Sequence, residues 1–276
     1  MNGTKQNNKE KNYFRFTAVE DTGFMLQGID LSNGNQTTPD VNIEISTDGI
    51  TWNTWDFQPT ELLASETVYM RGNNPDGFSK LNLDENTGIC HMFMFGDGKI
   101  ECHGNIMSLL YGYGFEDKYT IPRDCCFFGL FRGCTSLTTA PELPATTLSA
   151  YCYYYMFGDC TSLTTAPELP ATTLTTCCYA VMFMSCSSLT TAPELPATTL
   201  ANDCYSSMFA ACTNLSEITM LATDISADGC LYYWVGGVAS TGILNKNPNM
   251  NDLPTATEDN YYSGIPEGWT VVDYQE

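Results

Sequence analysis

Residues 135–148 read TSLTTAPELPATTL, and the same fourteen letters return at residues 161–174. A third copy at residues 187–200 differs only by Ser187 at its first position. The offset is 26 residues each time, and a fourth, decayed copy, TNLSEITMLATDI, begins at Thr213. Self-similarity at a fixed period of roughly 20–50 residues is typical of repeat architectures. We therefore expect the repeats to decide the fold.

The segments between these copies keep the same period. Counted from the first cysteine of a repeat, apolar residues stand at offsets 0, +1, +4, +5 and +8, which predicts one face of a short helix. The threonine-rich SLTTAPEL that follows predicts a short strand. One strand and one helix per repeat is the unit of a leucine-rich repeat solenoid, in which stacking supplies the core. The two cysteine series are Cys126, Cys152, Cys178, Cys204 and Cys230, and Cys134, Cys160, Cys186 and Cys212.

The prolines of the repeats limit the expected sheet. Each PELP segment holds two prolines at matching positions of the period. Because proline donates no ladder hydrogen bond, we expect a narrow parallel sheet centred on SLTT and an extended path through PELP. The prolines are Pro141, Pro167 and Pro193 in one series and Pro144, Pro170 and Pro196 in the other.

The N-terminal third of the chain lacks the period. The runs YFRFTAV, NIEISTDGITWNTW and TVYMRGN alternate in the manner of half-buried strands, and Asp48-Gly49 is typical of a tight hairpin turn. The predicted fold is therefore mixed α/β: a sandwich-like antiparallel β domain, then a leucine-rich repeat solenoid of 26-residue strand–helix units, then a cap. We expect a polar tail at 1–12, the β domain at 13–88, the solenoid at 89–235 and the C-terminal cap at 236–276.

The repeat consensus also resembles a known family. The pattern C-Y-x-x-M-F-x-x-C-T-S-L-T-x-A-P-x-L-P-A-T-x-L in residues 126–235 resembles the leucine-rich repeats of the BspA-like surface proteins of Bacteroides-type gut and oral bacteria. GKIECHGNIMSLL looks like the entry segment of such arrays, and TGILNKNPNM…SGIPEGWTVVD looks like their tail. The resemblance implies adhesion or partner binding without catalysis.

Charge excludes two classes of partner. The chain has 32 acidic and 11 basic residues, a formal net charge of −21, and no Lys, Arg or His lies between Gly133 and Asn245. Such a surface repels nucleic-acid phosphates and anionic lipid headgroups.

There is no run of about 18 apolar residues, so no membrane insertion is expected. The N-terminus MNGTKQNNKEKNYFRF lacks an apolar h-region, which indicates a removed leader or an exit without one.

Motifs for chemistry are missing. The thirteen cysteines form no C-x-x-C pair, and we expect most of them to be buried free thiols, with metal or redox roles as the alternative. His91 and His103 belong to no metal or catalytic pattern. We therefore predict no cofactor and no enzyme, while an enzyme within residues 13–88 remains the outside alternative.

Candidate contact residues come from two features of the repeats. Tyrosines occupy variable positions off the predicted core face, where they form a contact patch or merely cover the convex surface. A threonine strip follows the predicted sheet face. The candidate ligand-binding residues are Tyr151, Tyr154, Tyr155, Tyr232 and Tyr233 with Thr139, Thr165 and Thr191. Glu142, Glu168 and Glu194 form a weak candidate metal site, or an exposed series that simply faces solvent.

Two functions compete. The first is a non-enzymatic, surface-displayed adhesion protein that contacts a protein or glycan on a host or neighbouring cell, and is extracellular or on the cell surface. The second is a structural component of a bacteriophage virion, in a fibre, tail or capsid decoration, whose partners are other virion subunits. The missing leader and the unpaired cysteines favour the second reading, and the repeats favour the first.

Overall fold

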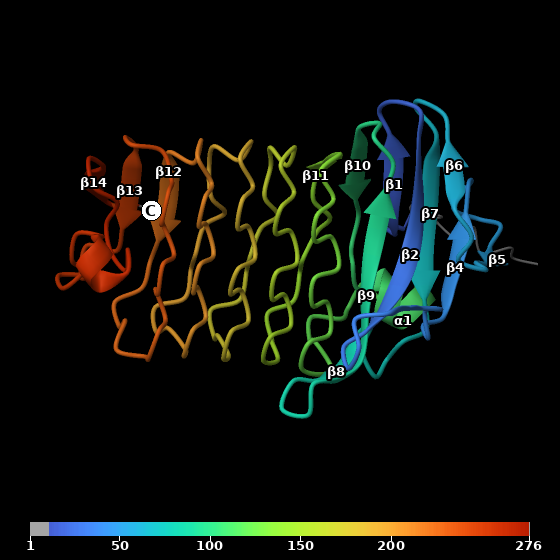
Figure 1. Cartoon of the computed structure of the whole chain (residues 1–276), viewed down its shortest axis with the longest axis horizontal. Helices are drawn as coiled ribbons and strands as arrows, with labels where there is room; N and C mark the ends of the chain where they lie inside the picture. Colours follow the sequence, from blue (N-terminus) through green and yellow to red (C-terminus); the bar gives the residue numbers. More distant parts are fainter. Residues whose placement is uncertain (1–10, 276) are drawn as a thin grey trace, which may run out of the picture.

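A computed structural model of the chain describes residues 11–275, so the predicted polar tail at 1–12 lies outside the described residues apart from Lys11 and Asn12. Figure 1 shows a layered N-terminal part, a row of repeats beside it, and a C-terminal end at the far side. The strands are β1 (Phe14–Ala18), β2 (Thr22–Asp30), β3 (Gln36–Thr37), β4 (Ile43–Ser46), β5 (Asn53–Thr54), β6 (Thr60–Leu62), β7 (Thr67–Gly72), β8 (Lys80–Asn82), β9 (Thr87–Phe95), β10 (Ile100–His103), β11 (Leu137–Thr139), β12 (Glu217–Met220), β13 (Ile243–Lys246) and β14 (Thr270–Asp273). The helices are α1 (Ser108–Tyr111) and the 3₁₀ turns η1 (Gly112–Gly114) and η2 (Glu258–Asn260).

The N-terminal strands form two packed sheets. One has the order β11-β10-β1-β7-β4-β5, and the other has the order β3-β2-β9-β8 with β6 paired to β2. Phe16 on β1 packs against Phe24 on β2 and Phe93 on β9, with ring centroids 5.2 and 4.9 Å apart. Side chains from two sheets thus share one core, as in a β-sandwich.

The N-terminal sheets run directly into the repeats. β9 and β10, which we expected to begin the repeat region, pair antiparallel with β2 and β1. β10 also pairs in parallel with β11 of the first repeat, Ile100 lying opposite Leu137. One buried cluster of side chains therefore extends from the sheets through all the repeats.

The predicted strand–helix solenoid of leucine-rich repeats is wrong, and so is the mixed α/β class. Within residues 11–275 the only α-helix is the four-residue α1, which lies before the first repeat. No repeat contains a helix, and only β11 and β12 are strands within the repeated segments. The chain is nearly all strand and turn.

Each segment between the two cysteines of a repeat is a run of four-residue turns. Every fourth residue has a positive φ, for example 55° at Tyr155 and 63° at Asp159. Local and long-range hydrogen bonds alternate along the run: the Gly158 amide donates to the Tyr155 carbonyl at 3.3 Å, and the next amide, of Asp159, donates to the Met184 carbonyl in the following repeat at 2.8 Å. The same alternation, with a step of 25 residues, recurs in successive repeats.

The apolar pattern explains why a helix was predicted. Offsets 0, +1, +4, +5 and +8 fit a period of four as well as one of 3.6 over so short a window. At about 100° per residue, a helix would rotate position +8 roughly 80° away from position 0, whereas four-residue turns keep 0, +4 and +8 in line. A left-handed residue at every fourth position rules out an α-helix.

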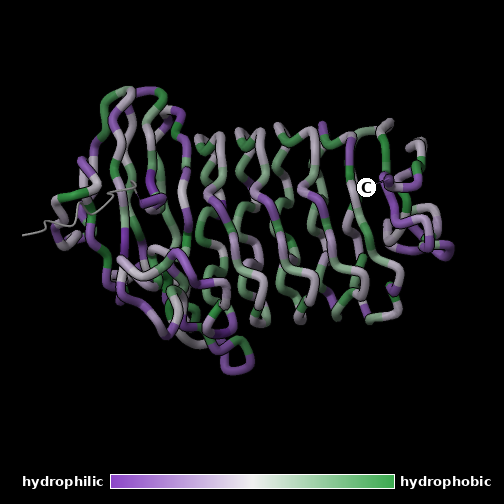
Figure 2. Tube along the Cα trace, turned by 180° about the vertical axis from the view of Figure 1, so that it is seen from behind, coloured by the Kyte–Doolittle hydropathy of each residue, from purple (hydrophilic) through white to green (hydrophobic). Residues whose placement is uncertain are grey.

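Stacked side chains fill the space between the repeats. Phe157 lies between Phe131 and Phe183, with centroids 5.3 and 5.6 Å away and interplanar angles of 1° and 6°. Tyr153 and Tyr179 stack in the same way at 5.9 Å. Hydrophobic and polar residues recur at corresponding places from one repeat to the next (Figure 2).

The strand side of the repeats is sparsely paired, as the prolines predict. In the middle repeats it is reduced to isolated parallel bridges, Thr139 with Thr165 and Thr191 with Glu217. Regular pairing resumes after the last PELP segment, in the parallel sheet β12-β13-β14. At this end Trp234 donates its indole N–H to the Gly264 carbonyl at 2.9 Å.

Within residues 11–275, none of the helices has the length and apolar character that crossing a bilayer requires.

Candidate functional site

Three of the five candidate tyrosines form a half-buried cluster near the first repeats. The Tyr154 ring stacks on Phe128 at 5.0 Å and lies 5.8 Å from Tyr151. The Arg132 guanidinium lies 4.4 Å from the Tyr155 ring centroid, and burial raises the pKa of the Tyr155 hydroxyl. A hydrogen bond with Cys177, followed by burial, raises the pKa of Tyr151 to about 12.

The other two candidate tyrosines lie at the far end of the stack. Tyr232 is 45% exposed and packs on Tyr261 at 5.2 Å, and Tyr233 is 39% exposed and packs edge-on against Tyr262 at 5.3 Å. Two repeats separate them from the first cluster. At the corresponding positions, one of these repeats has Ala180 and Val181 and the other has Ser206 and Ser207. The structure therefore does not join the five tyrosines into one patch.

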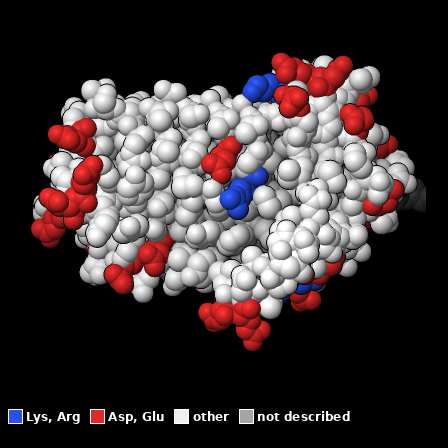
Figure 3. Space-filling view, viewed as in Figure 1, with Lys and Arg blue, Asp and Glu red and all other residues white. Residues whose placement is uncertain are grey.

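Thr139, Thr165 and Thr191, here called the threonine row, occupy matching positions in three successive repeats. Thr165 and Thr191 are exposed and Thr139 is half-buried. The Thr139–Thr165 bridge places the first two side by side, and the Thr191–Glu217 bridge carries the row into β12. On the face drawn in Figure 3, acidic side chains gather toward the two ends of the molecule and the middle of the repeats carries few charges.

The three candidate glutamates have different surroundings although all are exposed. Both carboxylate oxygens of Glu142 lie 2.7 Å from the Asn12 side-chain amide, which donates to them. Glu194 accepts a hydrogen bond from the Tyr274 hydroxyl at 3.1 Å. Glu168 has no side-chain partner among residues 11–275. Over the same residues, no group of three or more His, Cys, Asp or Glu side chains is arranged to hold a metal ion.

The cysteines are buried free thiols, which confirms that prediction. Those of the second series also hydrogen bond: their thiols donate to phenylalanine carbonyls of the preceding layer at 3.0–3.2 Å. Burial raises the pKa of each thiol, for example that of Cys178 to about 12. A neutral thiol is a weak nucleophile, so these side chains are suited to packing. The pairs are Cys134 with Phe93, Cys160 with Phe131, Cys186 with Phe157, and Cys212 with Phe183.

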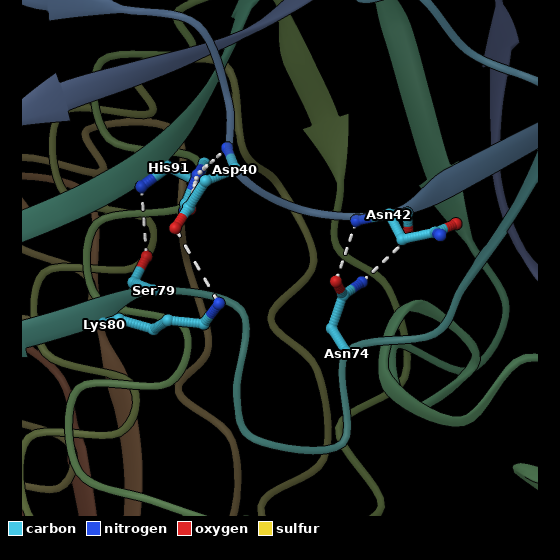
Figure 4. A network of polar contacts seen from close by, with 6 residues as sticks. All are labelled: Asp40, Asn42, Asn74, Ser79, Lys80 and His91. Carbon is cyan, nitrogen blue, oxygen red and sulfur yellow. Dashed lines mark hydrogen bonds and ion pairs between the residues drawn. The ribbon is translucent and has the colours of Figure 1, made fainter.

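The two histidines lie in different sheets. His91 on β9 is fully buried, and its Nε2 lies 3.2 Å from the Asp40 amide nitrogen and 3.0 Å from Asp40 Oδ1. Burial lowers the pKa of His91 to about 4, which favours the neutral ring, and the Asp40 amide N–H donates to its Nε2. Lys80 lies 3.7 Å from the other Asp40 oxygen (Figure 4). His103 on β10 contacts Glu101 at 3.0 Å.

Two pockets near this network and the neighbouring loop were not predicted from the sequence. One, of about 380 Å³, is lined by Asp40, Asn42, Trp55 and Asn73 among others. The second, of about 770 Å³, lies between the loop at 75–84 and the first repeats. Its lining includes Arg123 and the candidate Tyr151. Both depend on loops that approach from separate parts of the chain, for which the sequence carries no periodic signal.

Comparison with known proteins gave no relative: no family model, no curated protein and no solved structure matches the chain.

Proposed function

We propose that this protein is a non-enzymatic binding protein that contacts a protein or glycan ligand through the exposed side chains of its stacked repeats. The observation that carries the proposal is the threonine row, in which hydroxyl groups recur at one place in successive repeats. Backbone hydrogen bonds between repeats and stacked aromatic rings hold the row on a rigid support. Preorganised polar groups lose little conformational entropy on binding.

The surface has the chemistry of a polar contact face. Threonine hydroxyls both donate and accept hydrogen bonds, and the half-buried tyrosines offer rigid amphipathic area at one end. The excess of negative charge disfavours nucleic acid and anionic lipid. The resemblance of residues 126–235 to BspA-like surface proteins implies the same class of activity and display outside the cell.

The proposal is tested on an array of immobilised glycans and extracellular-matrix proteins. We expect the protein to retain at least one ligand, and the double variant Thr165→Ala/Thr191→Ala to bind it about tenfold more weakly, as the loss of two hydrogen bonds predicts. The matched control is Thr172→Ala/Thr198→Ala, which removes exposed hydroxyls from the same two repeats away from the row. Equal losses in both variants, or no ligand on the array, would contradict the proposal.

A further inference from the structure

A groove of about 370 Å³ lies between the PELP segments of the second and third repeats. Prolines form most of its wall, and two of the candidate glutamates line it. These lining residues are Pro167, Pro170, Pro193, Pro196, Glu168 and Glu194.

Prolines interrupt the pairing at this groove. A proline has no amide hydrogen, so two facing PELP segments cannot form a continuous backbone ladder. Among the described residues, no hydrogen bond joins 166–170 to 193–196. The next interface is paired: there the fourth copy has Thr219 at the position of Pro193, and the Leu195 amide donates to the Thr219 carbonyl at 2.9 Å.

The groove is rich in acceptors and poor in donors. Its lining side chains offer the carboxylates of Glu168 and Glu194 and no N–H group, while proline keeps its backbone carbonyl. Glu194 already accepts a hydrogen bond from the Tyr274 hydroxyl at 3.1 Å and has further acceptor capacity. The Glu168 carboxylate has no side-chain partner, and no Lys, Arg or His lies between Gly133 and Asn245 to neutralise it from within the repeats. A cationic donor from outside would satisfy these acceptors by charge-assisted hydrogen bonds.

We propose that this groove binds a lysine or arginine side chain presented by an extended segment of a partner protein. The proline rings pack against the methylene stem of that side chain, and the two carboxylates hold its charged end. The net charge of −21 attracts a basic segment over a longer range. None of the three threonines of the threonine row lines this groove, so its failure would leave the proposed function untouched.

The test uses a labelled, acetylated peptide of alternating alanine and lysine, and the same peptide with glutamine in place of lysine. Binding to the full chain is followed by fluorescence anisotropy at about 0.15 M salt, which screens long-range attraction. We expect the lysine peptide to bind and the glutamine peptide not to bind. The Glu168→Gln/Glu194→Gln variant should bind the lysine peptide about tenfold more weakly.

The matched control is Glu142→Gln/Glu217→Gln, which removes the same charge from exposed glutamates in the first and fourth copies, outside the groove. This control should bind within about twofold of the unchanged protein, because only general attraction is altered. Equal weakening in the two variants would reduce the effect to net charge and overturn the proposal. Binding of the glutamine peptide as tight as that of the lysine peptide, or no binding of either, would also overturn it.

Discussion

At the scale of single residues, the most consistent property is the burial of the thiols. All thirteen cysteines are free and buried, and burial raises the pKa of each above the ordinary 9.0, that of Cys212 to about 12. The folded state therefore holds its thiol protons more tightly than the unfolded chain does. Stability arising from this difference is fully present below about pH 9 and is lost as the pH rises toward the folded-state values.

This difference predicts alkaline unfolding. Each thiol lowers the free energy of unfolding by about 1.4 kcal/mol for every pH unit between its unfolded and folded pKa values. Because most of the thirteen thiols are deeply buried, their summed effect should unfold a protein of ordinary stability near pH 10. Denaturant unfolding at a series of pH values measures this, and the free energy should be nearly constant between about pH 7 and pH 8.

A single replacement provides the control for that series. Cys160→Ala removes one fully buried thiol, so the slope above pH 9 should become shallower by about 1.4 kcal/mol per pH unit. A free energy of unfolding that stays constant to pH 11 would contradict the account of the thiols.

At the scale of elements, the four-residue turn replaces the predicted helix. Its left-handed positions hold glycine in the first repeat, at Gly129 and Gly133, but non-glycine residues in the next three repeats. A left-handed conformation costs about 1–2 kcal/mol for a residue with a Cβ. Hydrogen bonds to the next repeat and stacked rings hold these residues in place.

The free-energy cost of a left-handed conformation at a non-glycine residue predicts a stabilising substitution. Ala211 is exposed and has a φ of 59°, so Ala211→Gly should raise the free energy of unfolding by about 0.5–1 kcal/mol after the greater entropy of glycine in the unfolded chain is counted. Ala64, which is also exposed and lacks a positive φ, is the matched control, and Ala64→Gly should lower stability by a similar amount. Urea unfolding of both variants measures the difference, and destabilisation by Ala211→Gly would argue against the turn.

The repeat period and the buried positions could be predicted from the sequence, whereas the elements that form within each repeat could not, for physical reasons. The length of the repeat, the buried cysteines and the sparse strand pairing at the prolines follow from residues that recur at the same position of each repeat. The helix was wrong because nine residues do not distinguish a period of 3.6 from one of four. The matching positions of the threonines follow from the repeat itself, and their role in binding stays a prediction. The groove at Pro167 and Pro193 lies where hydrogen bonds between two repeats are missing, a relation that the sequence of one repeat does not display.

At the scale of the whole molecule, the N-terminal sheets and the repeats share one core. β10 continues into the first repeat through β11, and the aromatic rings of β9 stack on those of the repeats, Phe93 lying 5.5 Å from Phe131. At the other end, Trp234 and the segment around Gly264 cover the turn side. The N-terminal sheets thus cover the first layer of the stack, whose apolar face would otherwise be open.

The stacking of turns between repeats is the claim on which both binding proposals depend. Nuclear magnetic resonance can detect scalar coupling across a hydrogen bond between an amide nitrogen and a carbonyl carbon, here from Val181. We predict coupling from Val181 to the Ser206 carbonyl in the next repeat, 2.8 Å from the amide nitrogen. Coupling to the carbonyl of Cys177, four residues earlier as in an α-helix, would contradict the account.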